Sequence, residues 1–154
     1  MIQEDKQLLL KDLCARLPYG VYCQIRYKCK NKIIEECKQL DGVFLNDTEC
    51  LFRSESGAEY SSDYKPYLRP MSSMTEDERE EIEVFIFNEW YQENSCKIDN
   101  EGWIEILANY DVSGIDPCFC SDYVDWLNEH HFDYRGLIPM GLALEAPKDM
   151  YKTE

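Results

Sequence analysis

The sequence predicts an α+β fold in one domain spanning residues 1–154. A helical pattern opens the chain, strand-like alternation dominates residues 19–70, and helical patterns return over residues 75–147. Because strands and helices occupy separate stretches, we expect a small antiparallel β-meander with the helical C-terminal half packed on it. A barrel-like curl is one form that such a meander can take. With 44% hydrophobic residues, the chain can bury a core.

Residues 3–17 are expected to form the first helix, which ends before Pro18. Its apolar stripe has helical spacing and consists of Leu10, Leu13, Cys14 and Leu17. Apolar and polar residues then alternate over 21–29, which predicts a half-buried strand.

The polar residues 30–32 predict a turn into a second strand over 33–40. Asp41-Gly42 is typical of a hairpin turn into the segment VFL. Residues 49–53 are a further short strand, and residues 54–64 are small, polar and without a period, which predicts a loop.

The segment KPYLRPM is expected to be extended, because Pro66 and Pro70 restrict it. Thr75 and Glu78 form a capping box, so a helix should begin at residue 76 and run to about 93. The stretch DNEGWIEILANYD fits a helix or a strand, and we assign a helix. Ser121 is expected to cap a final helix over 122–131.

The charge is distributed unevenly along the chain. Residues 70–154 contain 5 Lys and Arg against 20 Asp and Glu, which accounts for the whole net charge of −15. Such a half repels a free duplex, so nucleic acid is a disfavoured partner, and it attracts a basic protein surface. The alternative is that the acidic residues serve only to keep the protein soluble.

No apolar run is long enough to cross a membrane, and the acidic start of the chain differs from a secretory signal. We therefore expect a cytoplasmic protein whose eight cysteines are reduced thiols. Cys118 and Cys120 form a C-x-C pair, but no C-x-x-C motif occurs, so neither a metal nor a cofactor is expected.

The adjacent histidines of WLNEHHFDYRGL could belong to a reaction centre or to the packed end of a helix. On a helix, His130 falls on the apolar stripe with Trp126 and Leu127, whereas Asp122, Asp125 and Glu129 fall beside it. His131 lies about 100° further round, given 3.6 residues per turn, so the doublet is poorly placed to bind one metal ion. We therefore interpret His130, Trp126 and Leu127 as structural.

Two alternative kinds of site stay open. A small enzyme could use His131, Asp133 and Arg135, although no motif supplies a nucleophile. An oligonucleotide-binding module could instead use the face of the strand at 20–30, because this strand mixes basic and aromatic side chains. The candidate binding residues are Tyr22, Arg26 and Lys28 on this strand, and Tyr67 and Arg69 in the segment KPYLRP, which could be a peptide-like docking segment.

Three strings of the sequence resemble one family of small uncharacterised proteins. They are LLLKDLCARLPYGV, KPYLRPMSSMTEDE and DWLNEHHFDYRGLIPMGLALEAP, and they cover about a third of the chain. The family is encoded by gut Bacteroides-type bacteria, their phages and their mobile elements. The resemblance implies a bacterial or phage cytosolic protein and carries over no activity, cofactor or catalytic residue; Pro139 departs from the charged residue expected at that position.

The function predicted from the sequence is that of a non-enzymatic accessory protein that binds another protein through its acidic C-terminal half. An enzyme and an oligonucleotide-binding module are the alternatives.

Overall fold

A computed structural model describes residues 2–44, 49–54, 57–82 and 117–152. The chain divides into two compact units. One, here called the sheet unit, comprises Met1–Leu68 and Arg135–Glu154; the other, the helical unit, is Arg69–Tyr134. The C-terminal segment thus groups with the β-rich part of the chain, whereas we expected it to continue the helical part.

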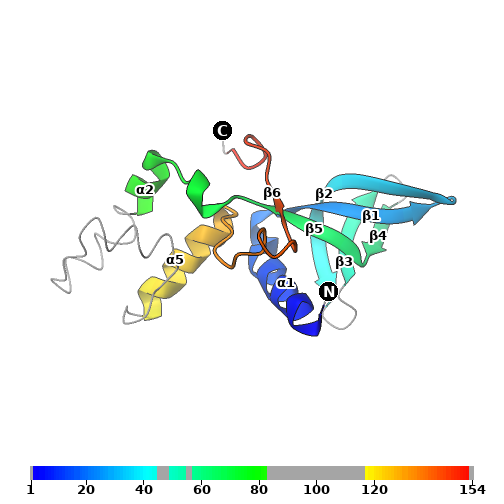
Figure 1. The fold of residues 1–154 in the computed structure, drawn as a ribbon, viewed down its shortest axis with the longest axis horizontal. Helices are drawn as coiled ribbons and strands as arrows, with labels where there is room; N and C mark the ends of the chain where they lie inside the picture. The colour runs from blue at the N-terminus through cyan, green and yellow to red at the C-terminus, as the bar shows by residue number, and fades with distance from the viewer. Residues whose placement is uncertain (1, 45–48, 55–56, 83–116, 153–154) are drawn as a thin grey trace. The chain divides into compact units, whose positions relative to one another are not determined.

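The sheet unit begins with the expected helix, α1 (Gln3–Arg16), followed by the single-turn helix η1 (Leu17–Tyr19). Six strands follow and are labelled in Figure 1. They are β1 (Tyr22–Cys29), β2 (Lys32–Phe44), β3 (Glu49–Ser54), β4 (Gly57–Ser61), β5 (Asp63–Leu68) and β6 (Leu144–Glu145).

The strand order is β4-β3-β2-β1-β5-β6. All neighbouring strands are antiparallel except β5 and β6, which are parallel. The α+β class is therefore confirmed, with β4 and β6 at the two ends of an open sheet. The barrel-like form that we considered is not supported.

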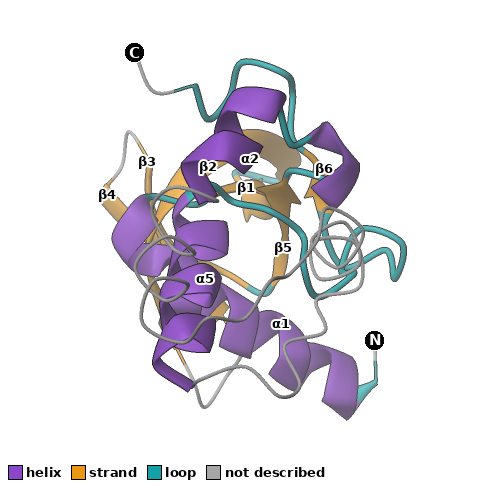
Figure 2. Ribbon diagram, turned by 90° about the vertical axis from the view of Figure 1, so that its left-hand side faces the viewer, coloured by secondary structure: helices purple, strands orange, loops and turns teal. Residues whose placement is uncertain are grey.

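The core of the sheet unit lies between α1 and one face of the sheet (Figures 1 and 2). Alternate residues of β1, β3 and β5 point into it, as the period of two requires. The C-terminal segment adds three further residues. The buried members are Leu9, Leu13, Val21, Cys23, Ile25, Leu40, Cys50, Phe52, Tyr64, Leu68, Leu137, Leu142 and Ala143.

The helical stripe of α1 was predicted one residue out of phase. Its buried residues are Leu9, Asp12, Leu13 and Arg16, while Cys14 is exposed. A charged pair occupies two positions of this stripe, which is why hydrophobicity alone selected the wrong face.

The turn predicted at Asp41-Gly42 is wrong, because β2 continues through it to Phe44. The register shifts between Leu40, which is opposite Phe52, and Gly42, which is opposite Leu51. Asp41 is thus the extra residue of a β-bulge, and its carboxylate contacts Arg53 at 3.2 Å.

The loop predicted over residues 54–64 is also wrong, since it contains β4 and the start of β5. Gly57, Ala58 and Ser61 have low strand propensity. They form a strand because β4 pairs with β3 from Cys50↔Ser61 to Ser54↔Gly57.

The helical unit contains η2 (Met71–Ser73), α2 (Glu76–Ile82) and α5 (Pro117–Glu129). The capping box is confirmed: the Thr75 backbone N–H donates to the Glu78 carboxylate at 2.9 Å, and the Glu78 N–H donates to the Thr75 hydroxyl at 3.2 Å. Continuation of this helix to residue 93 and the helix assigned to 99–111 lie outside the described residues.

The cap predicted at Ser121 is wrong, because α5 starts four residues earlier. Pro117 is its first residue, where proline needs no helical hydrogen bond. After Glu129 the described chain forms turns and β6, so a wholly helical C-terminal half is not supported.

Candidate functional site

The outer face of β5, β1 and β2 contains most of the binding residues predicted from the sequence. Register places Arg26 between Glu35 and Asp63, and Gln24 between Cys37 and Lys65. Lys28 is opposite Ile33. These side chains are exposed or half-buried, so this face is open to solvent in the sheet unit.

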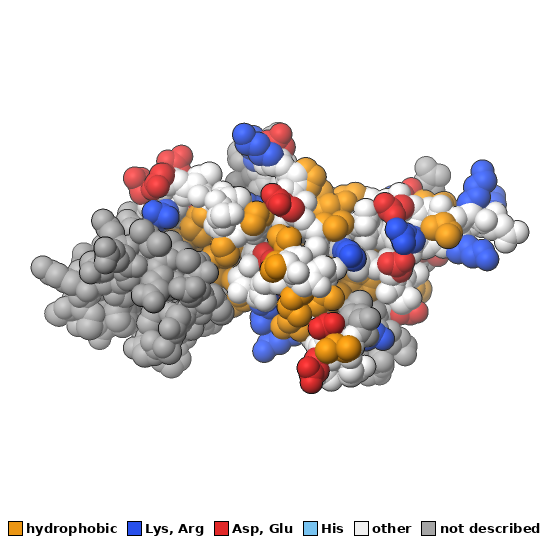
Figure 3. Space-filling view, viewed as in Figure 1, with side chains coloured by type: hydrophobic (Ala, Val, Ile, Leu, Met, Phe, Trp, Pro, Cys, Tyr) orange, Lys and Arg blue, Asp and Glu red, His pale blue; other side chains and the backbone are white. Residues whose placement is uncertain are grey.

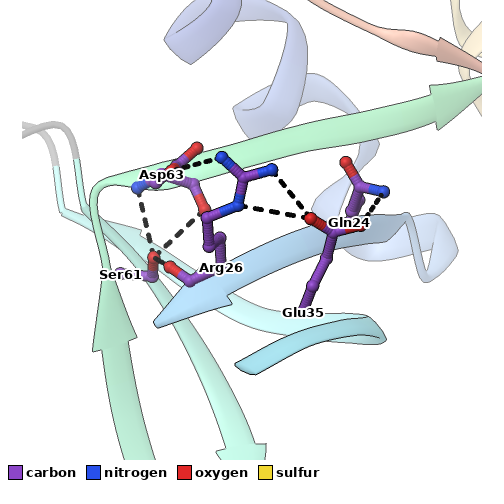
Figure 4. A network of polar contacts seen from close by, with 5 residues as sticks. All are labelled: Gln24, Arg26, Glu35, Ser61 and Asp63. Atoms are coloured by element: carbon purple, nitrogen blue, oxygen red, sulfur yellow. Dashed lines mark hydrogen bonds and ion pairs between the residues drawn. The ribbon is translucent and has the colours of Figure 1, made fainter. Parts of the chain in front are cut away.

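Arg26 is held by two carboxylates in a polar network (Figure 4). Its guanidinium donates to Glu35 at 2.8 and 3.2 Å and lies 3.7 Å from Asp63. The hydrogen bond to Glu35 is the main reason that the pKa of Arg26 is raised. Since these side chains are exposed to solvent, which screens their attraction, the pair adds little to stability.

The same network joins four strands, β1, β2, β4 and β5. Gln24 donates to the other oxygen of Glu35 at 2.9 Å. The Ser61 hydroxyl donates to the Arg26 carbonyl at 2.8 Å and accepts from the Asp63 backbone N–H at 3.1 Å (Figure 4). The network therefore fixes the corner between β4 and β5, and the positive charge of Arg26 is neutralised within the sheet.

Tyr22 and Tyr67 come together at the other end of this face through a residue that the sequence did not single out. The hydroxyl of Tyr151 accepts from the Tyr22 backbone N–H at 3.0 Å and donates to the Tyr67 carbonyl at 2.9 Å. It replaces a direct ladder bond beyond the pair Cys23↔Pro66. Burial raises the pKa of Tyr151 far above its usual range, so the hydroxyl stays protonated.

A buried ion cluster in the sheet unit was missed at the sequence level. Asp12 and Arg16 are both fully buried, and Arg16 donates to Asp12 at 2.8 and 3.0 Å. Arg135, which is 19% exposed, places its Nε 3.2 Å from Oδ1 of Asp12. Arg135 was a catalytic candidate, and the structure shows that it holds the C-terminal segment against α1.

The histidine doublet ends α5. His131 has φ 58°, its N–H donates to the Asn128 carbonyl at 3.1 Å, and the Phe132 N–H donates to the Leu127 carbonyl at 3.0 Å. These bonds form a Schellman motif with His131 at the left-handed position that glycine usually occupies. Phe132 and Leu127 occupy the two positions whose side chains usually form the hydrophobic contact of this motif, and both are fully buried.

The helical wheel placed His130 on the buried stripe, which is wrong, and made no prediction for the burial of His131. His131 is 3% exposed, whereas His130 is only half-buried. His130 stacks on Trp126 with 3.9 Å between ring centroids, and its Nδ1 lies 2.9 Å from the Trp126 carbonyl. Trp126 and Leu127 are buried and the three acids of the adjacent stripe are exposed, as predicted.

Arg69 links the end of α5 to the start of α2. It donates to both oxygens of Glu78, at 2.6 and 2.8 Å, and its guanidinium lies 4.2 Å from the Phe132 ring centroid. Burial raises the pKa of Glu78, but the hydrogen bonds from Arg69 and Thr75 outweigh it, and the net shift is downward. Arg69 is therefore engaged inside the helical unit.

The other two catalytic candidates, His131 and Asp133, form backbone hydrogen bonds with Arg69 in the helical unit. The His131 carbonyl accepts from the Arg69 N–H at 2.8 Å, and the Asp133 N–H donates to the Arg69 carbonyl at 2.7 Å. Asp133 is buried. Both residues thus belong to a short parallel bridge between residues 69 and 132.

The two buried cysteines of the described residues, Cys23 and Cys50, are core residues of the sheet unit. Burial raises the pKa of Cys50 to about 12 and that of Cys23 well above its usual range, so these thiols are protonated and poor nucleophiles. Cys14, Cys23, Cys29, Cys37 and Cys50 are all free thiols. Within the described ranges, no three His, Cys, Asp or Glu side chains gather as a metal site requires.

The helical unit carries almost all of the net charge. Its sequence holds 3 Lys and Arg against 17 Asp and Glu, a net charge of −14, whereas the sheet unit holds 13 against 14. Exposed carboxylates lie on both described helices of this unit. They are Glu76, Asp77, Glu80 and Glu81 on α2 and Asp122, Asp125 and Glu129 on α5.

No protein-family model, curated protein or solved structure matches the chain. Among the described residues, no helix has both the length and the apolar character needed to cross a bilayer.

Proposed function

We propose that this protein is a non-enzymatic binding protein that contacts a basic surface of another protein through its helical unit. The observation that carries the proposal is the division of charge: a net charge of −14 in the helical unit and −1 in the sheet unit. An acidity that served only solubility would need no such division.

Most of the exposed carboxylates of α2 and α5 form no ion pair with another residue of the described ranges. Among these seven, Glu76 alone forms an ion pair with another described residue, Arg79, at a distance of 3.8 Å. Like charges on one surface repel each other, and a cationic partner relieves this repulsion while being steered toward the surface.

The contacts of the catalytic candidates support a binding protein over an enzyme. Arg135 pairs with Asp12, His131 terminates α5, and Asp133 joins the bridge to Arg69. Each of these residues has a structural role that accounts for its position. In keeping with the sequence resemblance, we place the partner in the cytoplasm of a bacterial host of a phage or mobile element.

The proposal is tested by affinity capture from host lysate with two charge-matched variants. Glu80→Gln/Glu81→Gln removes two charges from α2, and Glu4→Gln/Glu145→Gln removes two exposed charges from the sheet unit. We expect wild type and the sheet-unit variant to capture the same basic protein at about 50 mM salt. The α2 variant should lose most of it, and about 300 mM salt should release it.

Equal capture by both variants, or capture that about 300 mM salt leaves intact, would contradict the proposal. Circular dichroism of all three proteins shows whether each is folded. Because the substituted side chains are exposed, their effects on stability should be within about 0.5 kcal/mol.

A further inference from the structure

The turn between β1 and β2 projects as a two-stranded ribbon, here called the lysine arm (residues 28–33). β5 pairs only with Cys23–Arg26 of β1, and β3 pairs only with the part of β2 that begins at Leu40. The ladder of the arm, from Lys28↔Ile33 to Cys29↔Lys32, is therefore made by β1 and β2 alone. Figure 1 shows the two strands running out together to their turn.

The turn of the arm is tight. Lys30 and Asn31 have φ values of 47° and 67°, so both residues at the tip adopt the left-handed conformation. Two such residues make the kind of turn whose twist matches that of the flanking strands. The ribbon thus stays two strands wide up to its tip.

Three lysines lie on this ribbon, and no carboxylate occurs within it. Lys28, Lys30 and Lys32 are exposed, and none of them forms an ion pair with another described residue. In Figure 3, basic side chains gather at the end of the view where Figure 1 shows this turn. Arg26, further along β1, contrasts with them because it is neutralised by Glu35 and Asp63.

The lysines point in different directions. Directly opposed residues of an antiparallel pair lie on the same face, and successive residues alternate. Lys28 shares one face with Ile33, Lys32 shares the other face with Cys29, and Lys30 is at the tip. A flat protein surface would meet only one of these faces, whereas a groove with an anionic wall on each side would meet both.

We propose that the lysine arm enters the major groove of duplex DNA. That groove is about 12 Å wide, admits a two-stranded β-ribbon and has a phosphate backbone on each side. Lys28 and Lys32 would contact opposite backbones.

This inference is independent of the proposed function, because the arm belongs to the nearly neutral sheet unit and the protein partner is assigned to the helical unit. Contact with about three phosphates predicts a slope of about −2.7 in log K against log salt. The affinity should thus fall about 40-fold between about 50 and 200 mM salt.

The test is fluorescence anisotropy of a labelled duplex of about 20 base pairs titrated with the full chain. The arm variant is Lys28→Gln/Lys30→Gln/Lys32→Gln. The control variant removes the same charge from elsewhere in the sheet unit: Lys6→Gln/Lys11→Gln/Lys148→Gln. At about 50 mM salt we expect wild type to bind, the arm variant to lose at least about tenfold in affinity, and the control variant to lose less than about threefold.

Three results would overturn the inference. The first is no saturable binding by wild type at about 50 mM salt, and the second is an equal loss in the arm and control variants. The third is binding without the need for a groove. It would be seen as equal or tighter binding of a single strand of the same length, or as equal competition by polyglutamate at the same charge concentration. Either observation would show that the arm responds to negative charge alone.

Discussion

Replacing Asp12 by asparagine should destabilise the sheet unit more than any other single charge removal within it. Asp12 is fully buried between two guanidinium groups, Arg16 at 2.8 Å and Arg135 at 3.2 Å. At an effective dielectric constant of about 20, opposite unit charges about 3 Å apart attract by about 5–6 kcal/mol. The asparagine side chain would keep the size and one acceptor oxygen but remove the buried negative charge that faces both guanidinium groups, so we expect a loss of about 3–5 kcal/mol.

The assay is urea unfolding followed by circular dichroism, which gives the free energy of unfolding for wild type and variant. Glu4→Gln is the control, because it removes an exposed charge from the same helix and should cost about 0.5 kcal/mol through the helix dipole. If the Asp12→Asn variant is as stable as the control, the buried charge of Asp12 contributes nothing to the stability of the fold, contrary to this prediction.

Three further predictions concern local contacts. The pKa of Glu78 is lowered in the fold, so its charge stabilises the protein fully above about pH 4.5. This stabilisation is lost as the pH falls through the folded pKa of Glu78. In thermal melts at a series of pH values, Glu78→Gln should therefore lose less stability than wild type on acidification. Tyr151→Phe should lower the free energy of unfolding in urea by about 1–3 kcal/mol, because the Tyr22 N–H and the Tyr67 carbonyl lose their hydroxyl partner. Tyr60→Phe, at an exposed position, is the control and should lower it by less than about 0.5 kcal/mol. His131→Val should lower the melting temperature well below that of His130→Val, since a β-branched residue is strained at φ 58°; equal melting temperatures would exclude the cap role.

Elements whose signals are local could be predicted from the sequence. The capping box at Thr75 and Glu78 depends on two side chains three residues apart, and the structure contains both of its hydrogen bonds. The alternation over β1 likewise reports which of its residues face the core. By contrast, Asp41-Gly42 is compatible with a turn or a bulge, and only the register of β2 against β3 decides between them.

The buried ion cluster was harder to predict, because charged residues can occupy buried positions when they pair with each other. Asp12 and Arg16 lie on a buried stripe with Leu9 and Leu13, and the i, i+4 spacing of an acid and a base was the available signal. That Arg135 completes the cluster follows only from the tertiary fold. The sequence places His131 close to Asp133 and Arg135, which suggested a catalytic role. Its left-handed backbone conformation instead makes it a helix cap.

The central claim, that the helical unit is the part that binds a protein partner, is tested most directly by amide hydrogen exchange with and without the captured basic protein. We expect slower exchange in Glu76–Ile82 and Pro117–Glu129 and unchanged exchange in β1 and β5. Protection confined to Tyr22–Cys29 and Asp63–Leu68, with the two helices unchanged, would contradict it.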